Sequence, residues 1–305
     1  MKKIIIYIFI IVACGYAVRE IIYGGLRENK FGIFDKYNTI FLKSNNYETL
    51  IIGSSRAESH FNCRIIDSVL KTNSYNIGIQ GSSLPFSLDV FSAYLENSKF
   101  PRNIIFNIDY HINACDNDTV FMYPRYFPYL SNKTLFKALE KRDKRFFGFR
   151  YFPYYSLAFM GDNYFSAAMR GFFDMPGQYD KDYYKGSTPI KDVKWKYKPY
   201  YACDEAVMYD RIDSIAAICK RHNANLFLVL SPNYSKASGQ ILNGVSLIQK
   251  LKEKAISNNV VLLDYNSDNL CNDSVLFADP YHMNEKGANL FTKKFSEDLR
   301  AIWKK

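Results

Sequence analysis

Five short apolar runs alternate with longer amphipathic segments in this sequence, and no other feature constrains the fold as strongly. Their Ile, Val, Leu and Phe residues follow one another without polar alternation, as expected of strands covered on both faces. Amphipathic segments between and after them predict helices near 62–70, 85–97, 204–222, 240–257 and 285–302. The sequence therefore predicts an α/β fold, a three-layer parallel sheet of about five strands with helices on both faces. The five runs are ETLIIG (48–53), SYNIGI (74–79), RNIIFNID (102–109), ANLFLVL (224–230) and NVVLLDY (259–265).

An insertion at about 115–200 interrupts this pattern after the third predicted strand. Between Phe121 and Tyr201 the chain has 15 Lys or Arg and 7 Asp or Glu, so this segment carries +8 of the formal net charge of +10. It also holds 25 aromatic residues, nearly half of those in the chain. We expect a local aromatic core with a solvated basic rim. A groove for anionic sugars and contact with an anionic membrane surface are alternatives. No nucleic acid is expected as a partner, because nothing resembles a nucleic-acid-binding module.

The N-terminus begins with MKK and continues as an uncharged run from Ile4 to Val18. This run is shorter than the roughly 20 residues of a membrane span, and it fits a minimal anchor or the core of a signal peptide. An uncleaved anchor is favoured because no small-x-small cleavage site precedes a polar start. Residues 11–14, Ile-Val-Ala-Cys, also resemble the lipobox of bacterial lipoproteins. A buried N-terminal strand is the remaining alternative.

These features predict three regions. Residues 1–20 form a membrane anchor or signal segment, 21–47 a stem, and 48–305 the main domain. Lysines at the start of an anchor would stay on the cytoplasmic side, so the main domain is expected outside the cytoplasm, on the periplasmic or cell-surface side.

The six cysteines include no CxxC pair and no His at metal-ligand spacing, so no metal site is expected. Outside the cytoplasm some of the five that follow Cys14 could pair, but one must stay free, and the sequence does not say which.

Small and polar residues follow the first three predicted strands. Gly53-Ser54-Ser55 ends the first strand, Gly81 lies just past the second, and Asp109 ends the third. Because ligands of parallel sheets gather at the carboxyl ends of the strands, these residues are expected at one edge.

A second polar group lies in the loop FADPYHMNEKGA (277–288), ahead of a helix that Asn284 can cap. Asp279 and His282 are three residues apart, so a short turn brings the carboxylate against one imidazole nitrogen while the other faces outward. This is the arrangement of an oriented general base. A serine at the end of the first strand would lie opposite it.

These motifs resemble those of the SGNH, or GDSL-like, hydrolase superfamily over about 48–305. Gly53-Ser54-Ser55 looks like the Gly-Asp-Ser block, with Ser55 in the nucleophile's place and Ser54 where the family has Asp. The stretch NIGIQG (76–81) looks like the second block, whose glycine, here Gly81, gives a backbone N–H to the oxyanion hole. Asp279-Pro280-Tyr281-His282 looks like the final Asp-x-x-His block.

The third block departs from the family pattern, Gly-x-Asn-Asp, whose Asn side chain donates to the oxyanion. This chain has FNIDYHIN, in which Asn107, His111 and Asn113 are the candidates. A missing donor costs about 2–4 kcal/mol of barrier, which slows such an enzyme without abolishing activity.

Other polar residues near these motifs have more than one interpretation. Arg56 is expected to be solvated or paired on its helix, with a clamp for a substrate carboxylate or phosphate as the alternative. Asp109 either caps a turn or hydrogen-bonds near the site. His60 and His222 are expected to be surface or packing residues.

The resemblance implies a flavodoxin-like fold and a serine esterase or O-acyltransferase that works through an acyl-enzyme, without cofactor or metal. Ser55 would be the nucleophile, His282 the base and Asp279 its orienting partner. The candidates for oxyanion or substrate binding are Gly81, Ser54, Asn107 and Arg56.

The order of segments along the chain is most similar to that of bacterial cell-envelope members, such as the alginate acetylation proteins and the protein that helps transfer D-alanine to teichoic acids. It implies an acylated envelope glycan or lipid as substrate and envelope acylation machinery as partner. The alternative is an inactive, membrane-tethered glycan-binding or assembly protein that keeps the fold.

Overall fold

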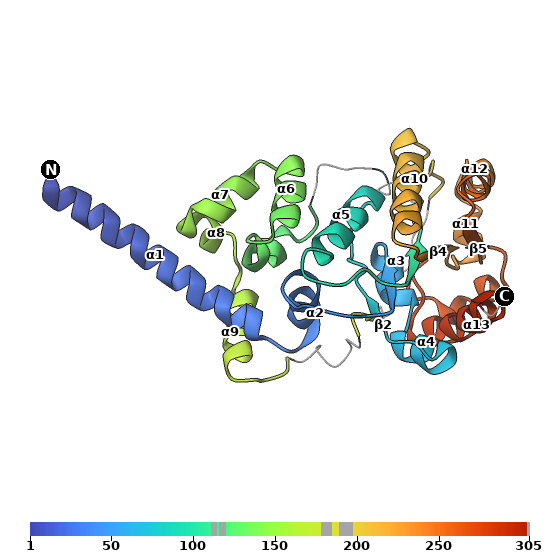
Figure 1. The fold of residues 1–305 in the computed structure, drawn as a ribbon, viewed down its shortest axis with the longest axis horizontal. Coiled ribbons are helices and arrows are strands. Elements are labelled where there is room, and N and C mark those ends of the chain that lie inside the picture. Colours follow the sequence, from blue (N-terminus) through green and yellow to red (C-terminus); the bar gives the residue numbers. More distant parts are fainter. Residues whose placement is uncertain (111–114, 116–119, 178–184, 189–197, 304–305) are drawn as a thin grey trace. The chain divides into compact units, whose positions relative to one another are not determined.

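The computed structural model describes residues 1–303 except 111–114, 116–119, 178–184 and 189–197 (Figure 1). The chain divides into two compact units, and each is described by itself. The first, the helical unit, comprises Met1–Lys43 and Asp118–Asp182. The second, the sheet unit, comprises Ser44–Asn117 and Tyr183–Lys305.

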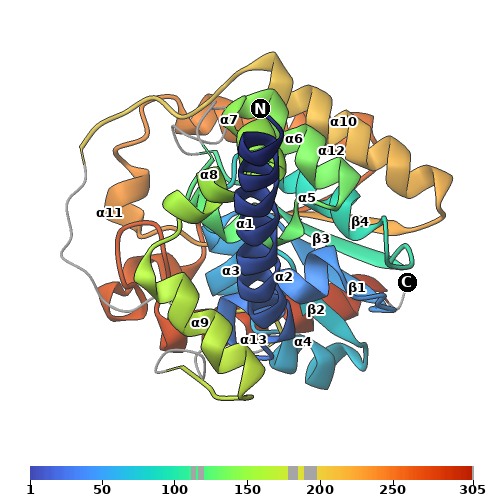
Figure 2. The ribbon, with the colours of Figure 1, turned by 90° about the vertical axis from the view of Figure 1, so that its left-hand side faces the viewer.

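The sheet unit is built on five parallel strands in the order β2-β1-β3-β4-β5, which is the flavodoxin-like order. Figure 2 shows β2, β1, β3 and β4 side by side. All five predicted strands are confirmed, each one to three residues shorter than its apolar run. The strands are β1 (Thr49–Ile52), β2 (Ser74–Asn76), β3 (Asn103–Asn107), β4 (Asn225–Leu230) and β5 (Val261–Asp264).

Helices cover both faces of the sheet, so the predicted three-layer α/β fold is confirmed. The helices are α3 (Ser55–His60), α4 (Cys63–Leu70), α5 (Leu84–Tyr94), α10 (Ala206–Arg221), α11 (Ser235–Ser238), α12 (Gly244–Ser257) and α13 (Glu285–Trp303), with short 3-10 turns η3 (Asn269–Asn272) and η4 (Ser274–Leu276). All five predicted helices are present, whereas α3 and α11 are too short to show a helical period. On one face Ile51 and Ile105 pack with Phe61, Phe291 and Phe295, which come from α13 and the segment between α3 and α4. Strand residues of the opposite parity are equally buried and face α5 and α10.

The helical unit contains α1 (Lys2–Glu28), α2 (Gly32–Phe41), η1 (Tyr123–Tyr129), α6 (Lys133–Arg142), α7 (Arg145–Tyr151), α8 (Pro153–Ala158) and α9 (Asp162–Phe172). The predicted boundary at residue 20 falls inside α1, and 21–47, expected to be a stem without periodicity, is largely helical. The alternative of a buried N-terminal strand is wrong, because α1 is a helix whose first half is exposed. α1 is the one helix among the described residues that is long and apolar enough to cross a membrane.

Aromatic residues form the core of the helical unit, in agreement with the local core expected of the insertion. Phe127, Phe146 and Phe149 are almost fully buried, and the Phe127 and Phe149 ring centroids lie 4.4 Å apart. Tyr37 of α2 stacks on Tyr126 of η1 with ring centroids 5.4 Å apart. Of the predicted insertion, 118–182 belongs to this unit, whereas the residues that follow return to the sheet unit.

A disulfide joins Cys115 and Cys203 within the sheet unit, with the two Cα atoms 5.8 Å apart. Cys63, Cys219 and Cys271 are free and buried. Of the five cysteines that follow Cys14, two pair and three stay free, whereas the sequence alone did not say which would pair.

Candidate active site

Ser55 lies at the junction between β1 and α3, where the backbone turns sharply at the carboxyl edge of the sheet. The turn depends on Gly53, whose φ is +140°, a conformation that L side chains rarely adopt. A Cβ there would also lie 2.8 Å from both the Ala57 Cβ and the Asn107 carbonyl oxygen. Glycine therefore allows the strand to pass close to β3 and α3, and Ser55 becomes the first residue of α3, partly exposed.

Ser55, His282 and Asp279 form a continuous hydrogen-bonded chain. The Ser55 Oγ lies 2.8 Å from His282 Nε2, and His282 Nδ1 lies 2.8 Å from Asp279 Oδ2. Three residues predicted from opposite ends of the sequence are thus brought together. A hydroxyl that contacts an imidazole held by a carboxylate can be deprotonated as it attacks a carbonyl carbon.

The loop that carries Asp279 and His282 is fixed by its own backbone. Asp279 Oδ1 accepts hydrogen bonds from the backbone N–H groups of Tyr281 and His282, at 2.8 and 2.9 Å. Phe277 and Met283 form an antiparallel bridge, and Asn284 Oδ1 accepts the Gly287 N–H, so it caps α13 as predicted. The carboxylate therefore organises both the turn and the imidazole.

Electrostatics favour an ionised Asp279. Burial raises the pKa of this carboxyl, but hydrogen bonds and charge from His282, with the two backbone N–H groups, outweigh burial and lower the pKa below its usual value. An ionised carboxylate keeps a proton on His282 Nδ1, which leaves Nε2 free to accept the Ser55 proton.

His60 also supports the loop that carries Asp279 and His282. Its Nε2 accepts the Met283 backbone N–H at 3.0 Å, and its Nδ1 lies 3.0 Å from the Ser231 Oγ. Because Nε2 accepts, a neutral His60 carries its proton on Nδ1 and donates it to Ser231. The prediction of a surface or packing role is confirmed in the second sense, since His60 has no exposed surface.

A buried polar network lies beside the nucleophile and is centred on Asp109. Ser54 Oγ donates to Asp109 Oδ2, while Arg56 Nη1 and Asn107 Nδ2 donate to Oδ1 at 3.1 and 3.2 Å. Arg56 Nη2 also donates to the Ser231 carbonyl. Of the two interpretations of Asp109, a hydrogen-bonding role near the site is confirmed.

The expectations for Arg56 need correction. Its side chain has no exposed surface, so it is neither solvated nor able to contact a substrate in this structure. It instead neutralises Asp109 inside the protein. Burial raises the pKa of Asp109, and the Arg56 guanidinium opposes this rise. The sequence pattern did not distinguish a buried arginine from an exposed one.

The second block approaches the nucleophile through α3. Glu58 of α3 accepts the Gln80 backbone N–H at 3.1 Å, and the next residue, Gly81, has a φ of +75°. Within the described part of the chain, neither the Ser55 nor the Gly81 backbone N–H donates a hydrogen bond to the protein. Both donors are therefore available to a ligand.

Of the three candidates for a further oxyanion donor, only Asn107 lies in the described part of the chain. The Asn107 amide is almost fully buried and already donates to Asp109, while its Oδ1 has no partner among the described residues. His111 and Asn113 lie outside the described residues.

Sequence reasoning missed Ser231, which follows β4 and contacts both His60 and Arg56. The one sequence signal that could have identified Ser231 is its position directly after the fourth apolar run and before a proline. In the described ranges no group of three or more His, Cys, Asp or Glu residues could hold a metal ion.

Comparison with known proteins gives likenesses of fold. No protein-family model matches the chain, and no curated protein matches it. A Desulfitobacterium hafniense protein described as lipolytic and of the G-D-S-L family is 9% identical, with a TM-score of 0.41 over 83% of this chain and 99% of its own. A Bacteroides fragilis structure described as an acylhydrolase is 12% identical, with a TM-score of 0.43 over 87% and 94%. A GDSL-like lipase from Bacteroides thetaiotaomicron is 13% identical, with a TM-score of 0.41 over 82% and 88%. These values are too low to assign a family, so function is argued below from the geometry of the site.

Proposed function

We propose that the chain is a membrane-tethered serine esterase or O-acyltransferase of the SGNH type. The observation that carries this proposal is the hydrogen-bonded chain from the Ser55 Oγ through His282 to Asp279, with 2.8 Å at each of its two side-chain contacts. The partial exposure of Ser55 and His282 supports it, because a substrate carbonyl can reach the hydroxyl.

In the proposed reaction the Ser55 Oγ attacks an ester carbonyl carbon, and His282 Nε2 takes the hydroxyl proton. The negative charge that develops on the carbonyl oxygen would be met by the unpartnered N–H groups of Ser55 and Gly81. Collapse of the tetrahedral intermediate breaks the bond to the alkoxy leaving group, which receives the proton from His282. An acyl-Ser55 intermediate and a free alcohol result.

The second half of the reaction regenerates the enzyme. Water or a sugar hydroxyl gives its proton to His282 and attacks the acyl-enzyme carbonyl, and Ser55 leaves with that proton. Asp279 stabilises the imidazolium in both halves without accepting a proton itself. Water as acceptor gives an esterase, and a glycan hydroxyl gives an O-acyltransferase.

A location outside the cytoplasm is part of the proposal. The apolar stretch of α1 supports tethering to a membrane, and Lys2 and Lys3 favour a cytoplasmic N-terminus. The disulfide between Cys115 and Cys203 supports an oxidising compartment. An acyl group on an envelope glycan or lipid is the substrate class that fits this location and the resemblance in the sequence, and envelope acylation machinery is the corresponding partner.

A fluorophosphonate probe, which reacts with activated serines, tests the proposal on the full-length protein in mild detergent. The wild type should be labelled and Ser55→Ala should not. Ser214→Ala, which changes an exposed serine of α10, should be labelled like the wild type. An unlabelled wild type, or a labelled Ser55→Ala, would overturn the enzyme proposal, and the former result would favour the inactive binding protein.

Transfer and hydrolysis are separated by their products. With a p-nitrophenyl ester as acyl donor, a transferase should acylate an added oligosaccharide, whereas an esterase releases only free acid. Detection of free acid alone, at saturating oligosaccharide, would count against transfer.

A further inference from the structure

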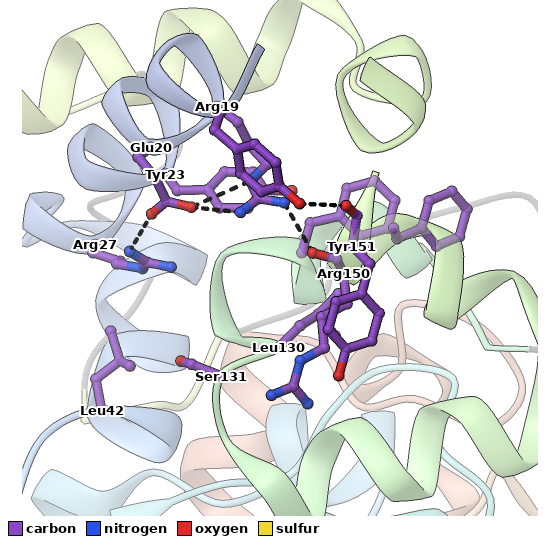
Figure 3. A pocket seen from close by; sticks show the side chains of 12 residues that line it. Arg19, Glu20, Tyr23, Arg27, Leu42, Leu130, Ser131, Arg150 and Tyr151 are labelled. Atoms are coloured by element: carbon purple, nitrogen blue, oxygen red, sulfur yellow. Dashed lines mark hydrogen bonds and ion pairs between the residues drawn. The ribbon is translucent and has the colours of Figure 1, made fainter. Parts of the chain in front are cut away.

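A cavity in the helical unit has no part in the proposed reaction. It is open to the surface, has a volume of about 540 Å³ and is lined mainly by α1, by η1 with the residues after it, and by α7 (Figure 3). We propose that it binds the phosphate of an anionic phospholipid at the membrane surface. This inference rests on the proposal that α1 spans the membrane.

The lining of the cavity carries an excess of positive charge. Three arginines, Arg19, Arg27 and Arg150, and one acidic residue, Glu20, line it. Glu20 accepts hydrogen bonds from Arg19 at 2.9 Å and from Arg27 at 3.1 Å, as Figure 3 shows, so it orients both guanidinium groups. Three cations and one anion leave a net charge of +2 in the lining, which favours an anionic ligand.

Arg150 leaves the most donors for such a ligand. Among the described residues its guanidinium donates no hydrogen bond and is held only by aromatic rings, with its Cζ 4.3 Å from the Phe136 centroid and 5.4 Å from that of Tyr151. Its backbone carbonyl accepts a hydrogen bond from Arg19 at 2.9 Å, which fixes α7 against α1. A stacked guanidinium with its N–H groups free is suited to bidentate contact with phosphate oxygens.

The position of the cavity along α1 identifies the ligand as a lipid. Arg19 is the first charged residue after the uncharged run that ends at Val18, so the cavity begins where the apolar stretch of α1 ends. Aromatic residues on α1 and beside it lie at the same position along the helix. Tyr16 donates its hydroxyl to the Tyr151 carbonyl at 2.5 Å, one turn before Arg19. Tyrosine at this depth is typical of the interfacial layer of a bilayer, on either side of the membrane.

Neighbouring helices extend the apolar surface of α1. Tyr154 of α8 donates to the Ile11 carbonyl at 2.6 Å, so α8 lies beside the apolar run and would reach membrane depth with it. α7, α8 and α9, with the residues that end them, expose many large apolar side chains, and an exposed apolar surface of this kind is typical of a membrane or protein contact. The exposed side chains are Phe147, Tyr151, Phe152, Tyr154, Tyr155, Phe159, Phe165, Met169, Phe172 and Phe173. A lipid whose phosphate occupies the cavity could lay its acyl chains against this surface.

Native mass spectrometry of the full-length protein in detergent tests the proposal. Three probes are added separately: dioctanoyl phosphatidylglycerol, dioctanoyl phosphatidylcholine and inorganic phosphate. The wild type should retain the anionic lipid in preference to the zwitterionic one. Arg150→Gln and Arg27→Gln should each weaken retention of the anionic lipid about fivefold, the effect of one basic residue near a charged membrane surface. Arg102→Gln, which changes an exposed arginine of the sheet unit, should behave like the wild type.

Equal retention of the two lipids, or unchanged retention in Arg150→Gln and Arg27→Gln, would overturn the proposal. Displacement of the anionic lipid by inorganic phosphate at equal concentration would also overturn it, in favour of a site for free anions. Arg150→Lys, which keeps the charge, should recover part of the binding and so separates loss of charge from loss of folding. Ser55 labelling should be unchanged in all these variants, so failure of the lipid site and failure of the proposed reaction are distinguishable.

Discussion

Asp109→Asn isolates the buried network beside the nucleophile. The substitution keeps the size of the side chain and an acceptor for Ser54, but it removes the charge that balances Arg56. The Arg56 side chain is 0% exposed and lies 3.1 Å from Asp109. An arginine cannot lose its proton to relieve this imbalance, so the folded protein must hold an unpaired buried cation.

Removal of one partner of a buried ion pair costs about 3–5 kcal/mol. For a unit of about 200 residues each kcal/mol corresponds to about 2–4 °C in Tm, so Asp109→Asn should melt about 6–20 °C below the wild type. Glu48→Gln provides the matched control, because Glu48 is half-exposed and only 4.0 Å from the exposed Arg102. A pair of this kind contributes about 0–1 kcal/mol, so the control should melt within a few degrees of the wild type.

Tryptophan fluorescence during heating measures the Tm difference between these variants in the sheet unit. One of the two tryptophans of the chain, Trp303, packs against the core of the sheet unit and reports on its unfolding. The double variant Arg56→Gln/Asp109→Asn, which holds no unpaired charge, should melt above Asp109→Asn alone. A Tm of Asp109→Asn within about 2 °C of the wild type, or a double variant no more stable than the single one, would refute the reasoning.

Three further changes probe the turn, the imidazole and the disulfide. Gly53→Ala places a Cβ 2.8 Å from two neighbours at a φ of +140°, so it should lower both the Tm and the rate of Ser55 labelling, whereas Gly239→Ala, which meets nothing closer than 3.7 Å, should change neither. The lowered pKa of Asp279 means that its pairing stabilises the fold above its unfolded pKa of about 3.9 and is lost as pH falls through the folded value. The Tm difference between wild type and Asp279→Asn should therefore be full at neutral pH and shrink below about pH 4, and a constant difference would contradict this. Reduction of the bond between Cys115 and Cys203, 88 residues apart, should cost about 2–4 kcal/mol, seen as a lower Tm with dithiothreitol that Cys115→Ser/Cys203→Ser does not show.

The sheet could be predicted because its signal is local. Each strand is a continuous apolar run, and the helices that separate the strands show a 3.6-residue period, so five strands and five helices follow from hydrophobicity alone. The joint presence of Gly53-Ser54-Ser55 and Asp279 with His282 was also visible, because parallel strands deliver their carboxyl ends to one edge. The contacts among these side chains agree with that expectation.

The burial of Arg56 and the helical structure of residues 21–47 were not predictable in the same way. Arg56 has the same sequence signal as a solvated arginine. Its burial depends on Asp109 and on the Ser231 carbonyl, which are distant in sequence and meet only in the fold. Residues 21–47 lack a clear period because α1 and α2 are stabilised by aromatic side chains of the insertion, such as Tyr126 against Tyr37. Tertiary contacts of this kind override local propensity.

The central claim is that Ser55, activated by His282, is the nucleophile, and the position of the fluorophosphonate adduct tests it most directly. Trypsin should release residues 44–56, SNNYETLIIGSSR, which contain both Ser54 and Ser55. Fragmentation of this peptide by tandem mass spectrometry should place the adduct on Ser55, and His282→Ala should abolish it. An adduct on Ser54 or on another peptide, or full labelling of His282→Ala, would contradict the account.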